Sequence, residues 1–544
     1  MLLGKIASKA WSLPPARNEV TITRGIRIPM SDGTELIADH YSPVTRRPAA
    51  TVLVRTPYGL SMPASLQNAH LIAERGYHVL YVSCRGTCGS GGAFDPGRHE
   101  AADGQDCVAW LRERDWFDGR LVTFGMSYLG FAQWALAMDP PPELRAAVVL
   151  VGLHEFGRSV HGGGPFGLHN TLSWAGHMAV QERGRPADRL MRLAVGDRRL
   201  RAAMAANPIA DAARTLLRGE SEWFEDWMSS RADDPYWEPR SCAAALEKIE
   251  APVLLVGGWQ DLFLRQTLAQ YRALSERGVT TRLVVGPWAH LDVAVRGGGV
   301  VMREALEWLD RYAGPDAPEV SAGGQASVRV HVGGAGWRDL AGWPPPASAG
   351  QPWGLRPGGR LVPPGTPRED PDAGDRFRYD PSDPTPAVGG AIMSRGAGVR
   401  DNRGLEARPD VLVYTSEPLQ APLEVAGEVI AEIDLERDNP YADVFVRLCD
   451  VSPDGRSANV CDGIVRLTGG DPLRSTVTVS ASSAAHRFAP GHRVRVQVSG
   501  GAHPRFARNP GTGALDAGPA ELRDTRYRVR PDSAVILPVL RPPG

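Results

Sequence analysis

Between about residue 20 and residue 290, the chain alternates short apolar runs with longer segments in which apolar positions recur at helical spacing. Unbroken apolar runs are typical of strands buried on both faces of a sheet. Their alternation with helical segments predicts an α/β core, a sheet covered by helices on both faces. The predicted strands are ATVLVRT (50–56), YHVLYVS (77–83), LVTFG (121–125), AAVVLVG (146–152), PVLLVGG (252–258) and RLVVG (282–286).

The segment ahead of this core has a different pattern. VTITRGIRIPMSDGTELIADHYSP alternates apolar and polar positions on either side of the turn residues Ser31, Asp32 and Gly33. This pattern predicts an antiparallel hairpin at the edge of the sheet.

The alternation of strands and helices stops between about residues 155 and 245. This stretch is rich in Ala, Arg, Leu, Trp and Met and has helical periodicity. A group of helices inserted between two core strands predicts a cap over a site.

A third pattern follows the core. The Gly/Pro/Ala-rich stretch AGPDAPEVSAGGQAS after Tyr312 predicts a linker. Beyond it, VRVHVGG, DVLVYTS, DVFVRLCDV, STVTVSA and HRVRVQVSG alternate with period two between turn residues, which predicts an all-β sandwich or jelly roll. The predicted division is a core in two parts (1–152 and 246–315), a helical cap (153–245) and a β domain (316–544).

Charge and composition exclude several function classes. Lys plus Arg number 61 and Asp plus Glu 62, so the chain has no bulk basic field for nucleic acid or an anionic membrane. No apolar run approaches the ~20 residues that span a bilayer, and MLLGKIASKAWSLPP lacks the apolar region of a secretory signal. We therefore expect a cytoplasmic protein with no nucleic-acid or membrane partner. The six cysteines form no C-x-x-C pair, so neither a zinc site nor a disulfide framework is indicated and free thiols are expected. We expect no metal and no cofactor.

A candidate nucleophile follows one of the predicted strands. GMSYLG (125–130) nearly matches the G-x-S-x-G of serine hydrolases, in which a sharp strand-to-helix turn exposes the serine hydroxyl. Ser127 has the required context, since LVTFG precedes it and a helical pattern follows. The second glycine comes one residue late, because Leu129 takes its place and Gly130 follows; this glycine could still provide close packing between turn and helix.

A candidate base and its orienting acid follow two later strands. In α/β-hydrolases the triad has the chain order Ser, Asp or Glu, His, and the last two lie beyond the carboxyl ends of strands. Asp261 follows PVLLVGG and His290 follows RLVVG. Ser127, Asp261 and His290 are therefore the predicted triad.

Two other motifs are given little weight. HGGG (161–164) resembles a loop that supplies oxyanion donors in some lipases, but that loop precedes the nucleophile, and here it follows Ser127. We interpret it as a turn. GTCGSGG (86–92) has Phe94 in the place of the last glycine of a dinucleotide fingerprint that starts at Gly89.

Five motifs together resemble one known family. The chain resembles the hydrolases similar to cocaine esterase and X-Pro dipeptidyl peptidase over nearly its whole length, and in that family the elbow itself is G-x-S-Y-x-G. The resemblance implies an α/β-hydrolase core, a helical cap and a C-terminal jelly roll. The motifs are RTPYG (55–59), GMSYLGFAQW (125–134), GGWQDLF (257–263), GPWAH (286–290) and YDPSDPTPAVGG (379–390).

The resemblance also implies an oxyanion hole. Its donors would be the backbone N–H of Tyr128 and the hydroxyl of Tyr58. One position departs from the family, because Ser83 stands where relatives often have Asp, which leaves the charge partner of Arg85 open.

The residues after Asp261 bear on the substrate. Leu262, Phe263, Leu264 and Arg265 follow it, whereas relatives that act on α-amino-acid esters have acidic residues there. A substrate ammonium needs carboxylates when buried. We therefore expect a serine esterase for small-molecule esters with neutral, bulky or aromatic acyl groups.

Phe263 matches an aromatic residue of the acyl pocket in cocaine-esterase-like enzymes. Trp174 would add a wall from the cap, or would belong to the core of the cap.

Two functional alternatives stay open at this point. One is an α-amino-acid ester hydrolase or X-Pro dipeptidyl peptidase, if cap carboxylates reach the site. Another, a non-catalytic binding protein, requires a broken triad, and no triad member is missing. A homodimer is a candidate assembly. The cap carboxylates are Glu225, Asp226, Asp233 and Asp234.

Overall fold

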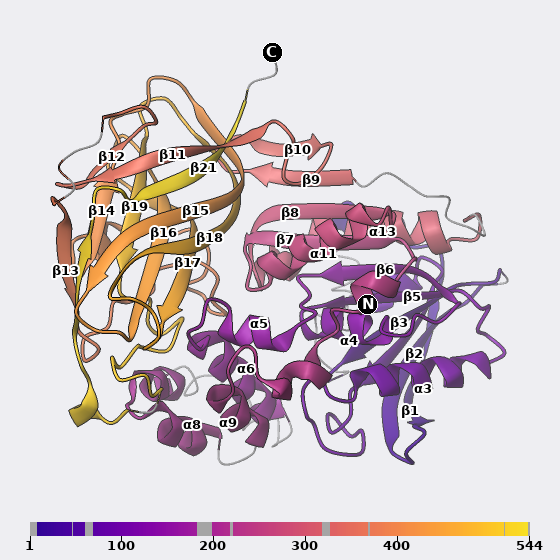
Figure 1. Ribbon diagram of the computed structural model, residues 1–544. Helices are drawn as coiled ribbons and strands as arrows, with labels where there is room; N and C mark the ends of the chain where they lie inside the picture. Colours follow the sequence, from indigo (N-terminus) through magenta and orange to yellow (C-terminus); the bar gives the residue numbers. More distant parts are fainter. Residues whose placement is uncertain are drawn as a thin grey trace.

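The structure is a computed structural model that describes residues 8–45, 47–59, 69–181, 198–217, 221–317, 327–367, 370, 372–515 and 517–541. Residues 182–197 of the predicted cap and 318–326 of the predicted linker lie outside the described residues. Figure 1 shows an α/β part, a group of helices below it and a β domain beside both.

The α/β part is built on one ten-stranded sheet with the order β1-β2-β4-β3-β5-β6-β7-β8-β9-β10. The six predicted core strands form β3 to β8, each within three residues of its predicted bounds, and run parallel. β1 and β2 form the predicted antiparallel hairpin at the edge. The bounds are β1 (Val20–Pro29), β2 (Glu35–Pro43), β3 (Thr51–Thr56), β4 (His78–Ser83), β5 (Leu121–Met126), β6 (Leu144–Leu150), β7 (Val253–Gln260), β8 (Thr281–Ala289), β9 (Ser327–Val332) and β10 (Gly336–Leu340).

Helices cover both faces of this sheet, as the apolar runs predict. Successive residues of β7 enter different cores: Leu255 packs in one cluster with Leu274, and Val256 in another with Leu309. Both faces are therefore buried, which explains why these strands show no polar alternation. The covering helices are α3 (Glu100–Arg112), α4 (Tyr128–Leu136), α10 (Ala245–Lys248), α11 (Leu264–Glu276), α12 (Asp292–Val295) and α13 (Gly298–Ala313).

One predicted strand belongs to a different sheet. VRVHVGG lies beyond the predicted boundary at 316, yet it forms β9, which pairs in parallel with β8, and β10 follows it in a hairpin. The pairing partner was not predicted, because a period-two pattern indicates a strand with one buried face and carries no information about its partner.

The predicted cap region is helical. Its described elements are α5 (Phe156–His161), α6 (Leu168–Gln181), α8 (Ile209–Leu217), α9 (Glu222–Ser229) and the 3₁₀ turn η1 (Pro235–Arg240). Aromatic side chains of α6 and α9 pack on Phe156 of α5. The cap and the residues around the carboxyl end of β5 share one apolar core.

The β domain is the predicted all-β unit, a jelly roll whose eleven strands enclose one apolar core. The strands are β11 (Ser348–Arg356), β12 (Arg360–Val362), β13 (Asp375–Tyr379), β14 (Val411–Thr415), β15 (Leu423–Arg437), β16 (Ala442–Val451), β17 (Ser457–Leu467), β18 (Arg474–Phe488), β19 (Arg493–Ser499), β20 (Thr525–Val529) and β21 (Ala534–Leu540), with α14 (Arg403–Glu406) and η2 (Pro519–Glu521) between them.

Two further observations concern the chain as a whole. No disulfide joins any of the six cysteines, all of which lie among the described residues. Within the described ranges, no helix has the length and apolar character needed to cross a membrane.

Candidate active site

Three strand ends bring the predicted triad together. Ser127 directly follows β5, Asp261 follows β7 and His290 follows β8. Because these strands are parallel members of one sheet, their carboxyl ends lie at the same edge. Asp261 and His290 follow Ser127 by 134 and 163 positions in the sequence, and the three residues nevertheless meet at this edge.

Ser127 occupies a strained turn between β5 and α4. Its φ of 61° and ψ of −121° lie outside the regions that non-glycine residues ordinarily adopt. This conformation holds the residue at the first turn of α4 with the hydroxyl clear of the helix, as in a nucleophile elbow.

The late glycine of the motif has a packing reason. A Cβ added to Gly130 would lie 2.6 Å from the Cα of Gly152, so α4 approaches the segment after β6 too closely for any side chain. A Cβ on Gly125 would lie 2.3 Å from the Cβ of Leu129. Gly130 therefore does meet the packing demand, and Gly125 makes room for Leu129.

The imidazole of His290 lies between the other two groups. Its Nδ1 is 2.6 Å from Oδ1 of Asp261, and its Nε2 is 3.0 Å from Oγ of Ser127. The other oxygen of Asp261 accepts the backbone N–H of Phe263 at 2.8 Å. Since the carboxylate accepts the Nδ1 proton, Nε2 is left to accept the proton of the serine hydroxyl.

Tyr58 lies two residues beyond β3, with its hydroxyl at this same site. The hydroxyl accepts the indole N–H of Trp174 at 3.1 Å. Burial raises the pKa of Tyr58 to about 12, against the opposing effect of hydrogen bonds with Trp174, the Ser127 hydroxyl and the backbone of Tyr128. The hydroxyl of Tyr58, the backbone N–H of Tyr128 and the oxygen of Ser127 therefore lie close together.

Aromatic rings line the space around these groups. Phe263 presents its ring at right angles to that of His290, with centroids 5.3 Å apart. Trp174 of α6 stacks on Tyr128 and on Trp227. Trp174 is therefore both a residue of the cap core and a direct contact of Tyr58.

A buried charged group that no sequence pattern indicated lies behind the site. The hydroxyl of Tyr128 donates to Oε1 of Glu100 at 2.6 Å and accepts the N–H of Gly97 at 3.0 Å. Oε2 of Glu100 lies 3.3 Å from the guanidinium of Arg55. Arg55 belongs to the motif RTPYG. Glu100 lies in the first turn of α3, where an acidic residue usually serves only to interact favourably with the helix dipole. The sequence therefore did not indicate that Glu100 is part of the site.

The structure also settles three details of the motifs. Arg85 pairs with Asp103 at 2.6 Å and with Asp32 at 2.6 Å, so both partners come from outside its own loop. HGGG is a turn at the end of α5, where the carbonyl of Gly163 accepts the backbone N–H of Arg466 in the β domain. GTCGSGG closes on itself, with the N–H of Gly86 donating to the carbonyl of Gly91.

The four carboxylates of the cap named above lie at or near its surface. Glu225 is paired with Arg214 on the surface, and Asp233 lies near Arg231, also on the surface. Asp234 accepts the N–H of Tyr236 at the start of η1. Asp226 is exposed on α9.

Comparisons with known proteins agree with this architecture. Residues 32–292 match the family model described as X-Pro dipeptidyl-peptidase (S15 family), and residues 319–530 match that of the X-Pro dipeptidyl-peptidase C-terminal non-catalytic domain. Cocaine esterase from Rhodococcus sp. (strain MB1 Bresler) is 30% identical over 545 residues, which cover 91% of this chain and 94% of that protein.

Solved structures share the fold. An aminopeptidase from a marine sediment Thaumarchaeota archaeon has a TM-score of 0.81 at 22% identity, covering 97% of this chain and 98% of its own. An α-amino acid ester hydrolase has a TM-score of 0.78 at 23% identity, covering 96% and 97%. The two domain matches in this order, and a relative similar along nearly the whole length, show that the chain belongs to the family of X-Pro dipeptidyl-peptidase-like and cocaine-esterase-like serine hydrolases.

Proposed function

We propose that the chain hydrolyses carboxylic esters with neutral, bulky or aromatic acyl groups through an acyl-enzyme on Ser127. The observation that carries this proposal is the continuous contact from Asp261 through His290 to Ser127, at 2.6 and 3.0 Å. His290 takes the proton of the serine hydroxyl as Oγ attacks the ester carbonyl, and returns it to the departing alcohol. Water then cleaves the acyl-enzyme by the same steps, with His290 again as base.

The tetrahedral intermediate carries a negative oxygen that needs donors. In this proposal they are the hydroxyl of Tyr58 and the backbone N–H of Tyr128, which already approach each other beside Ser127. The hydrogen bond from Trp174 leaves the Tyr58 proton free to point at this oxygen. The buried pair of Glu100 and Arg55 holds the Tyr128 side chain, and so fixes the first residue of α4.

Covalent labelling tests the proposal directly. A fluorophosphonate should react with the folded protein at Ser127, with the adduct located by mass spectrometry after digestion. The His290→Ala variant serves as the control, since it retains the serine without its base and should label far more slowly. An unlabelled Ser127 in folded wild-type protein would contradict the proposal.

The residues around the site support the proposed preference for neutral acyl groups. Phe263 borders His290, and Arg265 is directed to the β domain, where it donates to Ser480 at 2.9 Å. Of the cap carboxylates, Glu225 and Asp233 are paired with arginines, Asp234 lies at the start of η1, and Asp226 is exposed on α9. None of these four side chains is buried, so they supply no buried partner for a substrate ammonium, and the Rhodococcus relative is likewise named an esterase.

Substrate preference should follow from this chemistry. Acetate and benzoate esters should be cleaved with higher kcat/KM than matched glycine and phenylalanine esters, because the three residues that follow Asp261 are apolar and offer no carboxylate to offset the desolvation of an α-ammonium. The kcat/KM values of the four p-nitrophenyl esters measure this preference, and amino-acid p-nitroanilides test separately for amide cleavage. Faster cleavage of the amino-acid esters, by tenfold or more, would favour the α-amino-acid ester hydrolase or dipeptidyl-peptidase alternative.

A further inference from the structure

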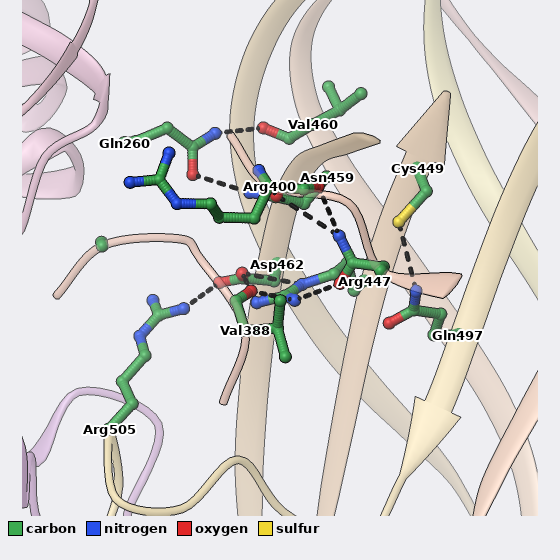
Figure 2. Close-up of polar contacts among 12 residues, drawn as sticks. Gln260, Val388, Arg400, Arg447, Cys449, Asn459, Val460, Asp462, Gln497 and Arg505 are labelled. Atoms are coloured by element: carbon green, nitrogen blue, oxygen red, sulfur yellow. Dashed lines mark hydrogen bonds and ion pairs between the residues drawn. The ribbon is translucent and has the colours of Figure 1, made fainter. Parts of the chain in front are cut away.

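A buried polar network in the β domain ends at the residue before Asp261. That residue, Gln260, is the last of β7 and is 6% exposed. Its amide nitrogen donates to the carbonyl of Val460 at 2.6 Å, and its oxygen accepts from Asn459 at 3.3 Å (Figure 2). The strand end that carries Asp261 is thus held by β17 of the β domain.

Asn459 connects this contact to a loop of the β domain, residues 388–402. Its side-chain oxygen accepts the backbone N–H of Arg400 at 2.7 Å, and its nitrogen donates to the carbonyl of Gly398 at 3.2 Å. Asn402 also donates to it at 3.4 Å. Asn459 is 2% exposed, so all its polar atoms depend on these partners.

The network continues to a buried ion pair. Arg447 donates to Oδ1 of Asn402 at 2.7 Å and pairs with Asp462 at 2.8 Å, and Arg505 approaches the other oxygen of Asp462 at 2.5 Å. Both members of the Arg447–Asp462 pair are nearly inaccessible to solvent. A buried pair of this kind is costly to form and rigid once satisfied, so it favours a single position of the loop.

The glycines of YDPSDPTPAVGG lie on this network. Gly389 and Gly390 have φ of +64° and +79°. A Cβ on Gly390 would lie 2.9 Å from the guanidinium of Arg505 and 3.0 Å from Asp462. The motif is therefore explained by a close approach of the loop to buried charges, a role that no local pattern in the sequence indicates.

The same loop reaches the cap on its other side. Asn170 of α6 accepts the N–H of Met393 at 2.9 Å and donates to the carbonyl of Ala391 at 3.4 Å. Trp174, one turn further along α6, donates to Tyr58. The loop 388–402 thus stands between the helix that contacts Tyr58 and the network that holds the end of β7.

We propose that Gln260 and Asn459 are positioning residues for Asp261, so that the β domain holds the acid of the triad in register with His290. The proposal rests on the proposed function of the triad. Its physical basis is the short contact of 2.6 Å between Asp261 and His290, which a small shift of the end of β7 would lengthen. The change in geometry acts on the transition state, in which the imidazole becomes charged, more than on the binding of a neutral ester.

The variant Gln260→Met tests this. It keeps the length of the side chain and removes both polar atoms. We expect kcat for a p-nitrophenyl ester to fall by about 10- to 100-fold with KM nearly unchanged. The matched control is Gln497→Met. This glutamine is 1% exposed, and its amide nitrogen donates to Glu406 and to Cys449 (Figure 2) within the β domain. The control should retain kcat at a comparable melting temperature.

A second variant and a spectroscopic measurement remove the dependence on folding and on turnover. Asn459 is linked to Asp261 through Gln260. The Asn459→Ala variant should therefore lower kcat to a similar extent, and the double variant should lose little more kcat than either single variant. The low-field proton resonance of the Asp261–His290 hydrogen bond should shift or broaden in both single variants and not in Gln497→Met.

The outcomes separate this proposal from the proposed function. The positioning role would be overturned if Gln260→Met had the same kcat as Gln497→Met and if the resonance were unchanged from the wild type in both variants. A wild-type protein that fluorophosphonate does not label would overturn the proposed function, yet the resonance would still report whether the β domain holds Asp261 against His290.

Discussion

Replacing Ser127 with alanine should lower kcat for ester hydrolysis by roughly 10⁴-fold or more. Only Oγ is removed, at a site where it contacts His290 at 3.0 Å, so the fold and the melting temperature should be retained. His290→Ala should cost about as much, and the double variant little more, because the two groups act as a unit. Asp261→Asn should retain the fold and disturb mainly the orientation of the imidazole.

The measurement is steady-state turnover of a p-nitrophenyl ester by folded protein. Ser275→Ala, at a serine on α11 whose hydroxyl donates to the carbonyl of Arg272, is a matched control that should retain full kcat. Full activity in Ser127→Ala would end the nucleophile assignment. Restored hydrolysis at another serine would appear as a fluorophosphonate adduct elsewhere.

Tyr58→Phe should lower kcat by about 10²–10³-fold, equivalent to roughly 2.7–4 kcal/mol of transition-state stabilisation. The ring is kept, and only the hydroxyl that accepts from Trp174 is lost. Because the ester carbonyl carries little charge before attack, KM should change much less than kcat. Tyr271→Phe is the control for the loss of a buried hydroxyl. Tyr271 lies on α11 and is 3% exposed, and the substitution removes only its hydroxyl.

The pH dependence of the same variant gives a second test. With its pKa raised to about 12, Tyr58 stays protonated and able to donate where an ordinary tyrosine would begin to ionise. The ratio of wild-type to Tyr58→Phe kcat should therefore be constant from about pH 7 to about pH 10. A variant that loses stability while each folded molecule keeps its kcat would make Tyr58 a packing residue.

Local patterns were sufficient for the parts of the site that depend on single strands. The strand, turn and helix around Ser127 are encoded within about ten residues, and the chain order of Asp261 and His290 placed them beyond parallel strands. The resemblance supplied Tyr58, because a tyrosine after β3 has no special pattern of its own.

The features that were not predicted depend on partners distant in sequence. Glu100 is buried only because Arg55 and Tyr128 meet it there. Likewise, the role of Gly390 depends on Arg447, Asp462 and Arg505, which lie on later strands and loops. Such contacts between charges are properties of the assembled fold, and periodicity in one segment cannot indicate them.

The pairing of β9 with β8 has a consequence for dividing the chain into fragments. A hydrolase fragment cut at residue 316 would lack β9 and β10, leaving the backbone N–H and C=O groups of β8 unpaired along a bare edge. Val328, Val330 and Val332, which are buried in the intact protein, would no longer cover the apolar residues beside them. Bare edges of this kind promote association between copies, so a fragment intended to stay monomeric should extend through Leu340.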